Sequence, residues 1–133
     1  MSGLVVDTHA LIWYLTASPR LSGSALTRIE NTIAAGDVVY VPAICLVEIT
    51  YLIEKGRLPT VTAERIAERL SQPDSGLVVA PLDRDVAEHV AKIPRAQIPD
   101  MPDRIIAATA SLLGLPLVTK DGRIRSGTLA TIW

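Results

Sequence analysis

Acidic side chains stand at four separated places along the chain where they could carry chemistry: Asp7, Glu48, the pair Asp100 and Asp103, and Asp121. Carboxylate oxygens are preferred ligands of hard divalent cations, and carboxylates that gather without a cation repel one another. The chain holds two His and one Cys, so no His or Cys cluster suggests zinc. If the acids converge in space, their chemistry predicts a Mg²⁺ or Mn²⁺ site.

Glu48 is the acid least expected where it stands. It is the one carboxylate in ICLVEITYLI (44–53), and its neighbours one helical turn away are Ile, Cys, Tyr and Leu side chains. We expect every face of this helix to be apolar, so that Glu48 cannot easily turn toward water. Because an unpaired buried carboxylate is costly, Glu48 must be protonated, paired with a buried Arg, or held by a metal.

The other acids have ordinary structural explanations when each is taken alone. Asp7 can N-cap a helix, and Asp121 can belong to an Asp-Gly turn. Asp100 and Asp103 can complement the dipole of the helix that they open. None of these explanations applies to Glu48. Taken together, two acids at strand ends, an acidic helix start and an acid inside a neighbouring helix favour one shared site.

The elements that must position these acids are short apolar runs alternating with longer helical patterns. The expected strands are residues 4–6, 38–41, 77–80, 116–119 and 129–133. The expected helices are residues 10–15, a helix capped by Ser22 that ends near Gly36, the Glu48 helix ending at Gly56, residues 62–72 after a Thr60 or Thr62 cap, a helix from Asp83 to Ala91, and one from Pro102 to Leu113.

This alternation predicts an α/β fold. We expect a three-layer α/β/α sandwich with a central, mostly parallel sheet, formed by residues 1–133 as a single domain. Ligand sites in such sheets gather outside the carboxyl ends of the strands. Asp7 and Asp121 directly follow expected strands or lie within a few residues of them, so both belong to that edge of the sheet.

The composition narrows the class of protein. With 49% hydrophobic and 20% charged residues, the chain is expected to be globular. No apolar run approaches the roughly 20 residues that span a bilayer, and the N-terminus does not resemble a signal peptide. The single Cys45 is expected to be a buried thiol, so a cytoplasmic location without a membrane is expected. The net charge of −1 gives no global sign of nucleic-acid binding, and scarce aromatics argue against base-stacking platforms.

Four segments carry a resemblance to a known family: LVVDTHALIWYL, LVEIT, PDRIIAATA and LVTKDGRI. In that order they resemble the PIN-domain ribonucleases, in particular the VapC toxins of bacterial and archaeal toxin–antitoxin pairs, over essentially the whole chain. Asp100 stands at the first position of a D-x-x-D-R pattern and is auxiliary. Met101-Pro102 departs from the Pro-Phe of many relatives, which alters loop packing. The resemblance implies a PIN-like fold with the catalytic and metal-ligating acids Asp7, Glu48, Asp103 and Asp121.

The same resemblance implies an activity and partners. The expected activity is that of a Mg²⁺- or Mn²⁺-dependent endoribonuclease that hydrolyses RNA phosphodiester bonds as the toxin of a toxin–antitoxin pair. Asp7, Asp103 and Asp121 would ligate the cation. Glu48 would ligate it or orient the attacking water. The implied partners are RNA, a cognate antitoxin whose tail blocks the site, and a second copy of the chain in a homodimer and a toxin–antitoxin hetero-oligomer.

Residues beside the acids could assist them. Thr8 and Thr119 adjoin acids, and their hydroxyls could hold a carboxylate or a water, or simply serve as caps. His9 could contact a phosphate, although a structural hydrogen bond is the stronger interpretation. Arg104 directly follows Asp103 and could orient an acid or a substrate phosphate through its planar fork.

Two further groups have competing interpretations. A basic set near Asp121 could form an RNA-binding rim or a solvated loop: Lys120, Arg123 and Arg125. An aromatic and apolar set is expected to serve core or dimer packing rather than base stacking: Trp13, Tyr14 and Leu15.

Other functions are compatible with parts of the pattern. A signalling receiver domain shares the size and the α/β alternation, but it needs an acid pair after the first strand, where this chain reads Asp-Thr-His. A phosphatase of the haloacid type needs an acid at the position of His9. A PIN nuclease of RNA processing that is not a toxin, and a catalytically inert binding domain, remain as alternatives within the fold.

Overall fold

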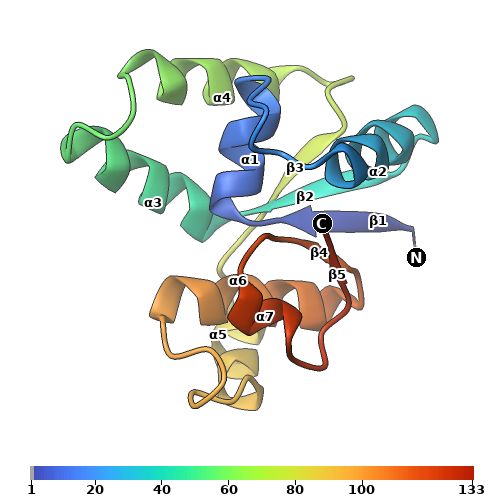
Figure 1. The fold of residues 1–133 in the computed structure, drawn as a ribbon, viewed down its shortest axis with the longest axis vertical. Coiled ribbons are helices and arrows are strands. Elements are labelled where there is room, and N and C mark those ends of the chain that lie inside the picture. Colours follow the sequence, from blue (N-terminus) through green and yellow to red (C-terminus); the bar gives the residue numbers. More distant parts are fainter. Residues whose placement is uncertain (1) are drawn as a thin grey trace.

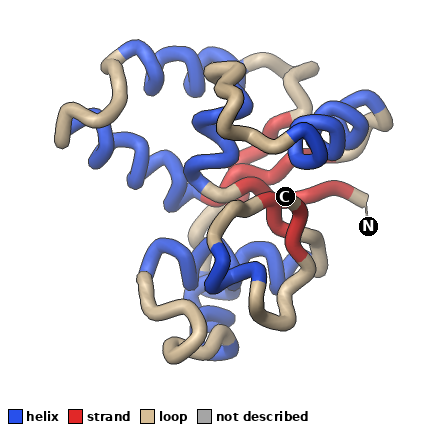
Figure 2. Tube along the Cα trace, viewed as in Figure 1, coloured by secondary structure: helices blue, strands red, loops and turns tan. Residues whose placement is uncertain are grey.

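A five-stranded parallel sheet forms the centre of the molecule (Figures 1 and 2). The computed structural model describes residues 2–133. Its strands are β1 (Gly3–Val6), β2 (Val38–Pro42), β3 (Leu77–Ala80), β4 (Leu117–Val118) and β5 (Thr131–Ile132). They are ordered β3-β2-β1-β4-β5, and the four neighbouring pairs are parallel. The predicted fold class is confirmed, and the sheet is parallel throughout.

Helices cover the sheet on both sides. They are α1 (Thr8–Leu15), α2 (Gly23–Ala34), α3 (Ala43–Glu54), α4 (Val61–Ser71), α5 (Arg84–His89), α6 (Met101–Leu113) and α7 (Gly122–Arg125), with a 3-10 turn η1 (Val90–Lys92) after α5. Figure 1 shows α1, α2 and α4 on one side of the sheet and α5, α6 and α7 on the other. No helix within residues 2–133 is long and apolar enough to cross a membrane.

The core is made by short apolar strands that are covered on both faces, as parallel strands require. Leu4, Val5 and Val6 of β1 are at most 1% exposed, and α6 adds an unbroken buried run from Ile105 to Ala110. Cys45 is also buried, and burial raises the pKa of its thiol. This core lies directly beneath the strand ends that carry the acids, so those ends are held by close packing.

Gly3 allows the first two strands to approach each other. Its φ is +138°, and a Cβ atom at this position would lie 2.7 Å from the carbonyl oxygen of Val38. Gly3 pairs with Val38 in the register of β1 and β2, so a larger residue would push the strands apart. Along the other side of β1, Val6 pairs with Val118 of β4. This register fixes which residues meet at the carboxyl ends of the two strands.

The helix boundaries depart from the predictions in three places. The first helix begins at Thr8, earlier than expected, because Asp7 is its N-cap. The helix that Asp83 caps ends at His89 and continues as η1. The predictions missed α7 because an Asp-Gly pair usually makes a turn. In the structure Asp121 caps this short helix instead.

Candidate active site

β1 and β4 are neighbours in the sheet, and the strands that follow each of them along the chain lie on opposite sides of this pair. β2 and β3 lie on the side of β1, and β5 lies on the side of β4. Sheets of this kind bind ligands in the crevice outside such a point. The N–H of Asp7 donates to the carbonyl of Val118 at 3.2 Å, so the residue after β1 lies beside the end of β4. Asp121 follows that end three residues later.

Asp7 caps α1 and also lines the cleft at the strand ends. Its Oδ1 atom accepts a hydrogen bond from the N–H of Ala10 at 2.9 Å. Burial raises the pKa of Asp7, while hydrogen bonds from the Thr119 side chain and the Ala10 backbone partly lower it. Asp7 is therefore a helix cap, as its sequence position suggested, but burial makes its negative charge costly.

Glu48 lies on α3, and the expectation that it cannot easily turn toward water is wrong. One face of α3 is exposed, where Val47 is 49% exposed and Tyr51 is 58% exposed. Glu48 is half-buried, lines the cleft and accepts a hydrogen bond from the Thr8 hydroxyl at 2.5 Å. Within residues 2–133 it has no Arg or Lys partner. Glu48 reaches solvent through the cleft, so neither a buried Arg nor protonation is needed to explain it.

Asp100 and Asp103 enter the cleft from the start of α6. Asp100 is exposed and caps this helix by accepting the N–H of Asp103 at 3.1 Å. Burial, the largest cause, and the negative charges of Asp100, Asp121, Glu48 and Asp7 together raise the pKa of Asp103 to about 7. The five acids therefore act on one another electrostatically, although they come from distant parts of the chain.

Asp121 is positioned by two kinds of hydrogen bond. Its Oδ1 atom accepts the N–H groups of Arg123 and Ile124 at 2.8 and 3.3 Å. Its own N–H donates to the Thr119 hydroxyl at 3.0 Å. Thr119 is fully buried and also contacts Asp7, so one threonine links the acids that follow β1 and β4.

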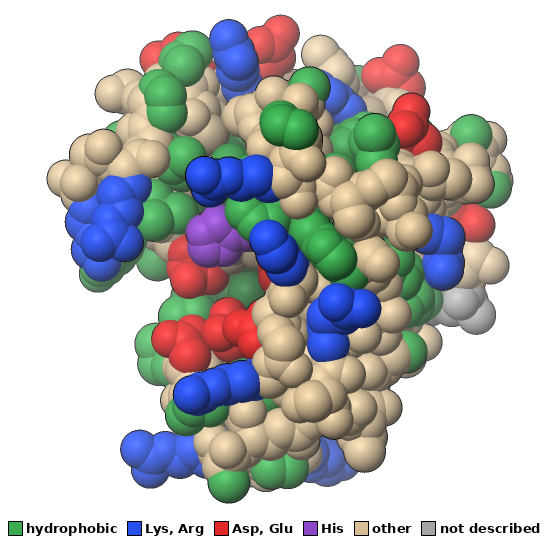
Figure 3. Space-filling view, viewed as in Figure 1, with side chains coloured by type: hydrophobic (Ala, Val, Ile, Leu, Met, Phe, Trp, Pro, Cys, Tyr) green, Lys and Arg blue, Asp and Glu red, His purple; other side chains and the backbone are tan. Residues whose placement is uncertain are grey.

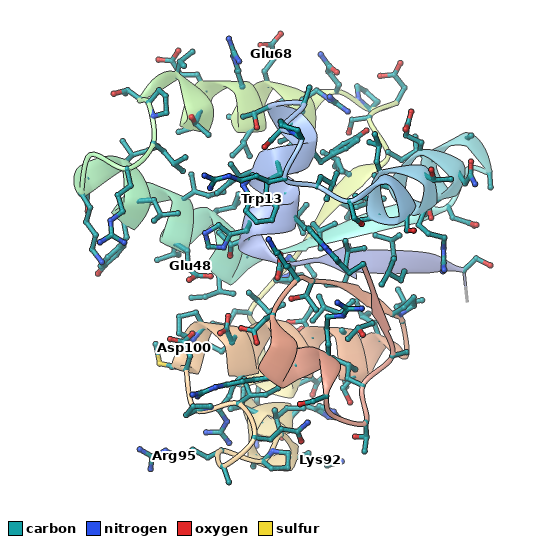
Figure 4. All side chains as sticks on the ribbon, viewed as in Figure 1. Trp13, Glu48, Glu68, Lys92, Arg95 and Asp100 are labelled. Atoms are coloured by element: carbon teal, nitrogen blue, oxygen red, sulfur yellow. The ribbon has the colours of Figure 1, made fainter. Side chains whose placement is uncertain are left out.

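These acids surround one open cleft of about 490 Å³. It is lined by Asp7, Thr8, His9, Trp13, Glu48, Asp100, Asp103, Lys120 and Asp121. Figure 3 shows the hollow with acidic side chains on both sides, and Figure 4 places Glu48 on one side and Asp100 on the other.

The donors in this cleft suit a hard divalent cation, because they are carboxylate and hydroxyl oxygens whose charges are otherwise poorly compensated. Within residues 2–133, however, no three His, Cys, Asp or Glu side chains are grouped closely enough to hold one ion. The acids face the same space without forming a closed ligand set. The fit therefore rests on donor chemistry and on the shared cleft.

Of the two roles suggested for Arg104, orienting an acid is not seen within residues 2–133. Its guanidinium donates to the backbone carbonyls of Val90 and Ile93, at distances from 2.8 to 3.2 Å. These carbonyls belong to η1 and the residue after it. Arg104 thus braces the segment between α5 and α6, and its effect on the cleft is to support the start of α6.

The expected basic rim is divided between two surfaces. Lys120 lines the acidic cleft, and its Nζ atom lies 5.9 Å from the ring centroid of Trp13. Arg125 lines a separate surface at the start of α2, beside Arg28. Arg123 is exposed on α7. Of the three residues, only Lys120 lines the cleft.

The sequence interpretation underrated two residues of α1, His9 and Trp13. Trp13 packs against the core as expected, but it also lines the cleft. The spacing of four residues between His9 and Trp13 places both on one face of a helix. Because Asp7 caps that helix, the same face lies next to the acids, and this signal was present in the sequence.

Comparison with known proteins supports the fold and shows the family. Residues 4–127 match the PIN domain family model. Ribonuclease VapC22 of Mycobacterium tuberculosis is 32% identical over 126 residues, which cover 95% of this chain and 92% of the relative. VapBC2 from Rickettsia felis, bound to a DNA fragment from its promoter, has a TM-score of 0.73 at 16% identity, covering 98% of this chain and 97% of that chain. A toxin–antitoxin complex from Klebsiella pneumoniae has a TM-score of 0.66 at 20% identity, covering 98% and 96%.

Proposed function

The chain belongs to the PIN domain family, and we propose that it is a metal-dependent endoribonuclease that acts as the toxin of a toxin–antitoxin pair. The observation that carries this proposal is the acidic cleft at the carboxyl ends of β1 and β4, where five carboxylates from four parts of the chain face one space. A curated relative named as a ribonuclease, and similar solved structures of toxin–antitoxin complexes, support the same assignment.

Mg²⁺ or Mn²⁺ is the cation that we assign to this cleft, held by Asp7, Glu48, Asp103 and Asp121. Hard cations prefer these oxygen donors, and a cation would offset the repulsion that helps to raise the pKa of Asp103. When bound, it supplies Lewis-acid polarisation of the phosphate and lowers the pKa of water. Asp100 is exposed and caps α6, so we assign it an auxiliary role.

The protein side chains contribute positioning and proton transfer. The Thr8 hydroxyl holds Oε1 of Glu48, which leaves Oε2 to accept a proton from the attacking water. The water oxygen bonds to phosphorus while the bond from phosphorus to the leaving ribose oxygen breaks. That oxygen takes a proton from solvent water to become a hydroxyl, and Glu48 releases its own proton to solvent. Thr119 holds Asp7 and Asp121 in fixed positions relative to each other. Lys120 offers a positive charge to the RNA backbone at the edge of the cleft.

The test is an RNA cleavage assay with purified protein in Mg²⁺, in Mn²⁺ and in excess EDTA. We expect cleavage in either metal, loss of cleavage in EDTA, and recovery when the metal is restored. A thermal melt provides a second readout, because Mg²⁺ should raise the Tm of the wild type but not that of Asp103→Asn. Undiminished cleavage in excess chelator would reject the metal site.

An apolar groove supports the proposed antitoxin partner. It adjoins the acidic cleft, shares His9 and Glu48 with it, and includes the exposed side chains Val47, Tyr51 and Met101. A peptide that buries apolar side chains in this groove and extends a basic residue into the acids would block the site. A PIN nuclease of RNA processing that is not a toxin would lack such a partner.

Co-expression separates these two functions. We expect the small open reading frame next to the gene to encode a DNA-binding antitoxin that co-purifies with this chain and suppresses its cleavage of RNA. The mass of the isolated chain in solution tests the proposed homodimer, and the mass of the complex tests the hetero-oligomer. Absence of any co-purifying neighbour, with cleavage intact, would favour the RNA-processing alternative.

A further inference from the structure

One part of the cleft lining carries aromatic and basic groups instead of acids. His9 and Trp13 lie one turn apart on α1, and both line the cleft together with Lys120. The ring centroids of His9 and Trp13 are 5.5 Å apart, and Lys120 Nζ lies 5.9 Å from the Trp13 centroid. Figure 4 shows Trp13 on α1, on the same side of the sheet as Glu48. An aromatic ring and a cation therefore stand next to the proposed cleavage site.

The ring of Trp13 is held in place by the fold. It meets the ring of Trp133 edge-on, with centroids 5.8 Å apart and an interplanar angle of 63°. Trp13 also packs against the core while remaining partly exposed. Because these contacts restrain the ring before any ligand arrives, little side-chain entropy is left to be lost on binding. The exposed part of Trp13 is thus a preformed surface at the cleft.

A polynucleotide supplies a chemical match for each of these groups. Its bases have flat faces that stack on aromatic side chains, and its phosphates bind lysine ammonium groups. The present contact of Lys120 with Trp13 is weak, because Lys120 is exposed and lies near the outer limit of about 6 Å for a cation over a ring. A base can replace the ammonium over the ring while Lys120 turns to the adjoining phosphate.

We propose that Trp13 is a stacking platform for one unpaired nucleobase beside the scissile phosphate, with Lys120 binding the next phosphate; this inference rests on the ribonuclease activity proposed above. A base inside a duplex is paired and covered by its neighbours, so it reaches Trp13 only after costly extrusion. The platform therefore restricts the substrate to single-stranded RNA or to single-stranded loops and ends. Trp13 is a specificity-determining residue.

The test uses a short single-stranded RNA whose cleavage position has been mapped, and versions that lack one base at each position flanking the cut. With wild-type protein, one abasic position should raise KM by about 5- to 100-fold, the range expected for one lost base–aromatic stack. Trp13→Leu should show this raised KM on the intact RNA, and the same abasic position should then cost nothing more. Trp13→Phe should fall between the two.

Trp133→Leu is the matched control. It removes the same Trp13–Trp133 contact from the other partner, and Trp133 lines a separate surface near the start of α2. We expect this variant to raise KM far less than Trp13→Leu does, because it loosens the ring without removing it, and to keep the wild-type response to the abasic position. Equal abasic penalties in wild type and Trp13→Leu, or an equal rise of KM in Trp133→Leu, would overturn the platform. RNA cleavage would continue in that case, so the ribonuclease assignment would stand.

Fluorescence provides a readout that does not depend on cleavage or on a stable Trp13→Leu variant. The chain has two Trp residues, so Trp133→Phe leaves Trp13 as the single reporter. In EDTA, titration with single-stranded RNA should quench this emission, and a duplex of the same sequence should quench it far less. Unchanged emission in the presence of bound RNA would reject stacking on Trp13. If no RNA is cleaved in any metal, the proposed function fails, and this titration still decides whether Trp13 stacks a base.

Discussion

The two sides of the cleft hold their carboxylates in different ways. On the side formed by α1 and α3, each acid has a donor: Asp7 accepts from Ala10 N–H, and Glu48 accepts from the Thr8 hydroxyl. On the side formed by α6, the Asp103 carboxylate has no hydrogen-bond donor within residues 2–133. Burial and four neighbouring acids raise its pKa to about 7. On the α1–α3 side, hydrogen bonds from the protein therefore hold the two carboxylates in position, although burial still raises the pKa of Asp7. On the α6 side, no such hydrogen bond within residues 2–133 holds Asp103.

This difference indicates where a cation matters most. The hydrogen bonds from Ala10 and Thr8 fix the positions of the Asp7 and Glu48 side chains without a ligand. Asp103 sits in the first turn of α6, where the helix dipole helps it, but this help does not offset burial and repulsion. We therefore expect substitutions on the α6 side to affect activity without loss of stability. On the α1–α3 side we expect loss of stability only where a substitution removes a hydrogen bond, as Asp7→Ala does.

Asp103→Asn should produce the largest effect. It removes a proposed ligand whose carboxylate accepts no hydrogen bond within residues 2–133, so kcat/KM should fall by about 10²-fold or more. The Tm in EDTA should stay the same or rise. Asp100→Asn is the matched control, since Asn remains a good N-cap, and it should cost less than about tenfold. Equal losses in the two variants would show that exposure does not distinguish these acids.

Glu48→Gln should lower activity by about 10²-fold, because a positioned proton acceptor contributes at least that much. The amide oxygen of Gln can still accept the Thr8 hydroxyl, so the melting temperature in EDTA should change little. Thr8→Val, which removes the donor, should lower activity by about tenfold, as expected for a supporting hydrogen bond. A strong destabilisation by Glu48→Gln would assign Glu48 a structural role and erase the contrast with the capping role of Asp7.

Asp7 should be the acid whose replacement reveals a structural contribution. Asp7→Ala loses the cap of α1 and should lower the free energy of unfolding by about 1 kcal/mol, whereas Asp7→Asn keeps the cap and should lose less. Both variants should lack nuclease activity. Urea unfolding in EDTA measures the difference between them. Equal stability of the Ala and Asn variants would mean that the cap contributes nothing, and that the two sides of the cleft are alike.

The smallest expected effect is a dependence of stability on pH. The folded pKa of Asp103, about 7, exceeds its ordinary value of 3.8, so between these values the folded state holds a proton that the unfolded state has released. Stability of the metal-free protein should therefore fall as pH rises through this window, and the loss should be complete above about pH 7.

Asp103→Asn provides the comparison for this effect because it cannot ionise. The Tm of the variant minus that of the wild type, measured in EDTA, should grow from about pH 5 to about pH 8. Saturating Mg²⁺ should reverse the trend by favouring the ionised carboxylate. A difference in Tm that stays constant with pH would show that the Asp103 charge is already compensated within the fold.

Local patterns in the sequence were sufficient for much of the architecture. The order of strands and helices, the α6 helix with Gly114 after it, and the positions of Asp7 and Asp121 after strands follow from apolar runs and helix-ending residues. Helix caps and turns were harder to tell apart from the sequence, because an Asp-Gly pair suits both a turn and the start of a helix such as α7. The choice depends on whether the following residues can bury a side chain such as Ile124, which is buried in the structure.

The environment of Glu48 and the role of Arg104 could not be obtained in this way. Helical spacing tells which side chains share a face, but it does not tell whether another element covers that face. Val47 and Tyr51 are exposed because no element within residues 2–133 packs over that part of α3. Arg104 turns to the carbonyls of Val90 and Ile93 because α5 and η1 end beside it. The residue types therefore set the chemistry that the acids can perform, and the packing of α1, α3 and α6 around two strand ends sets which groups meet.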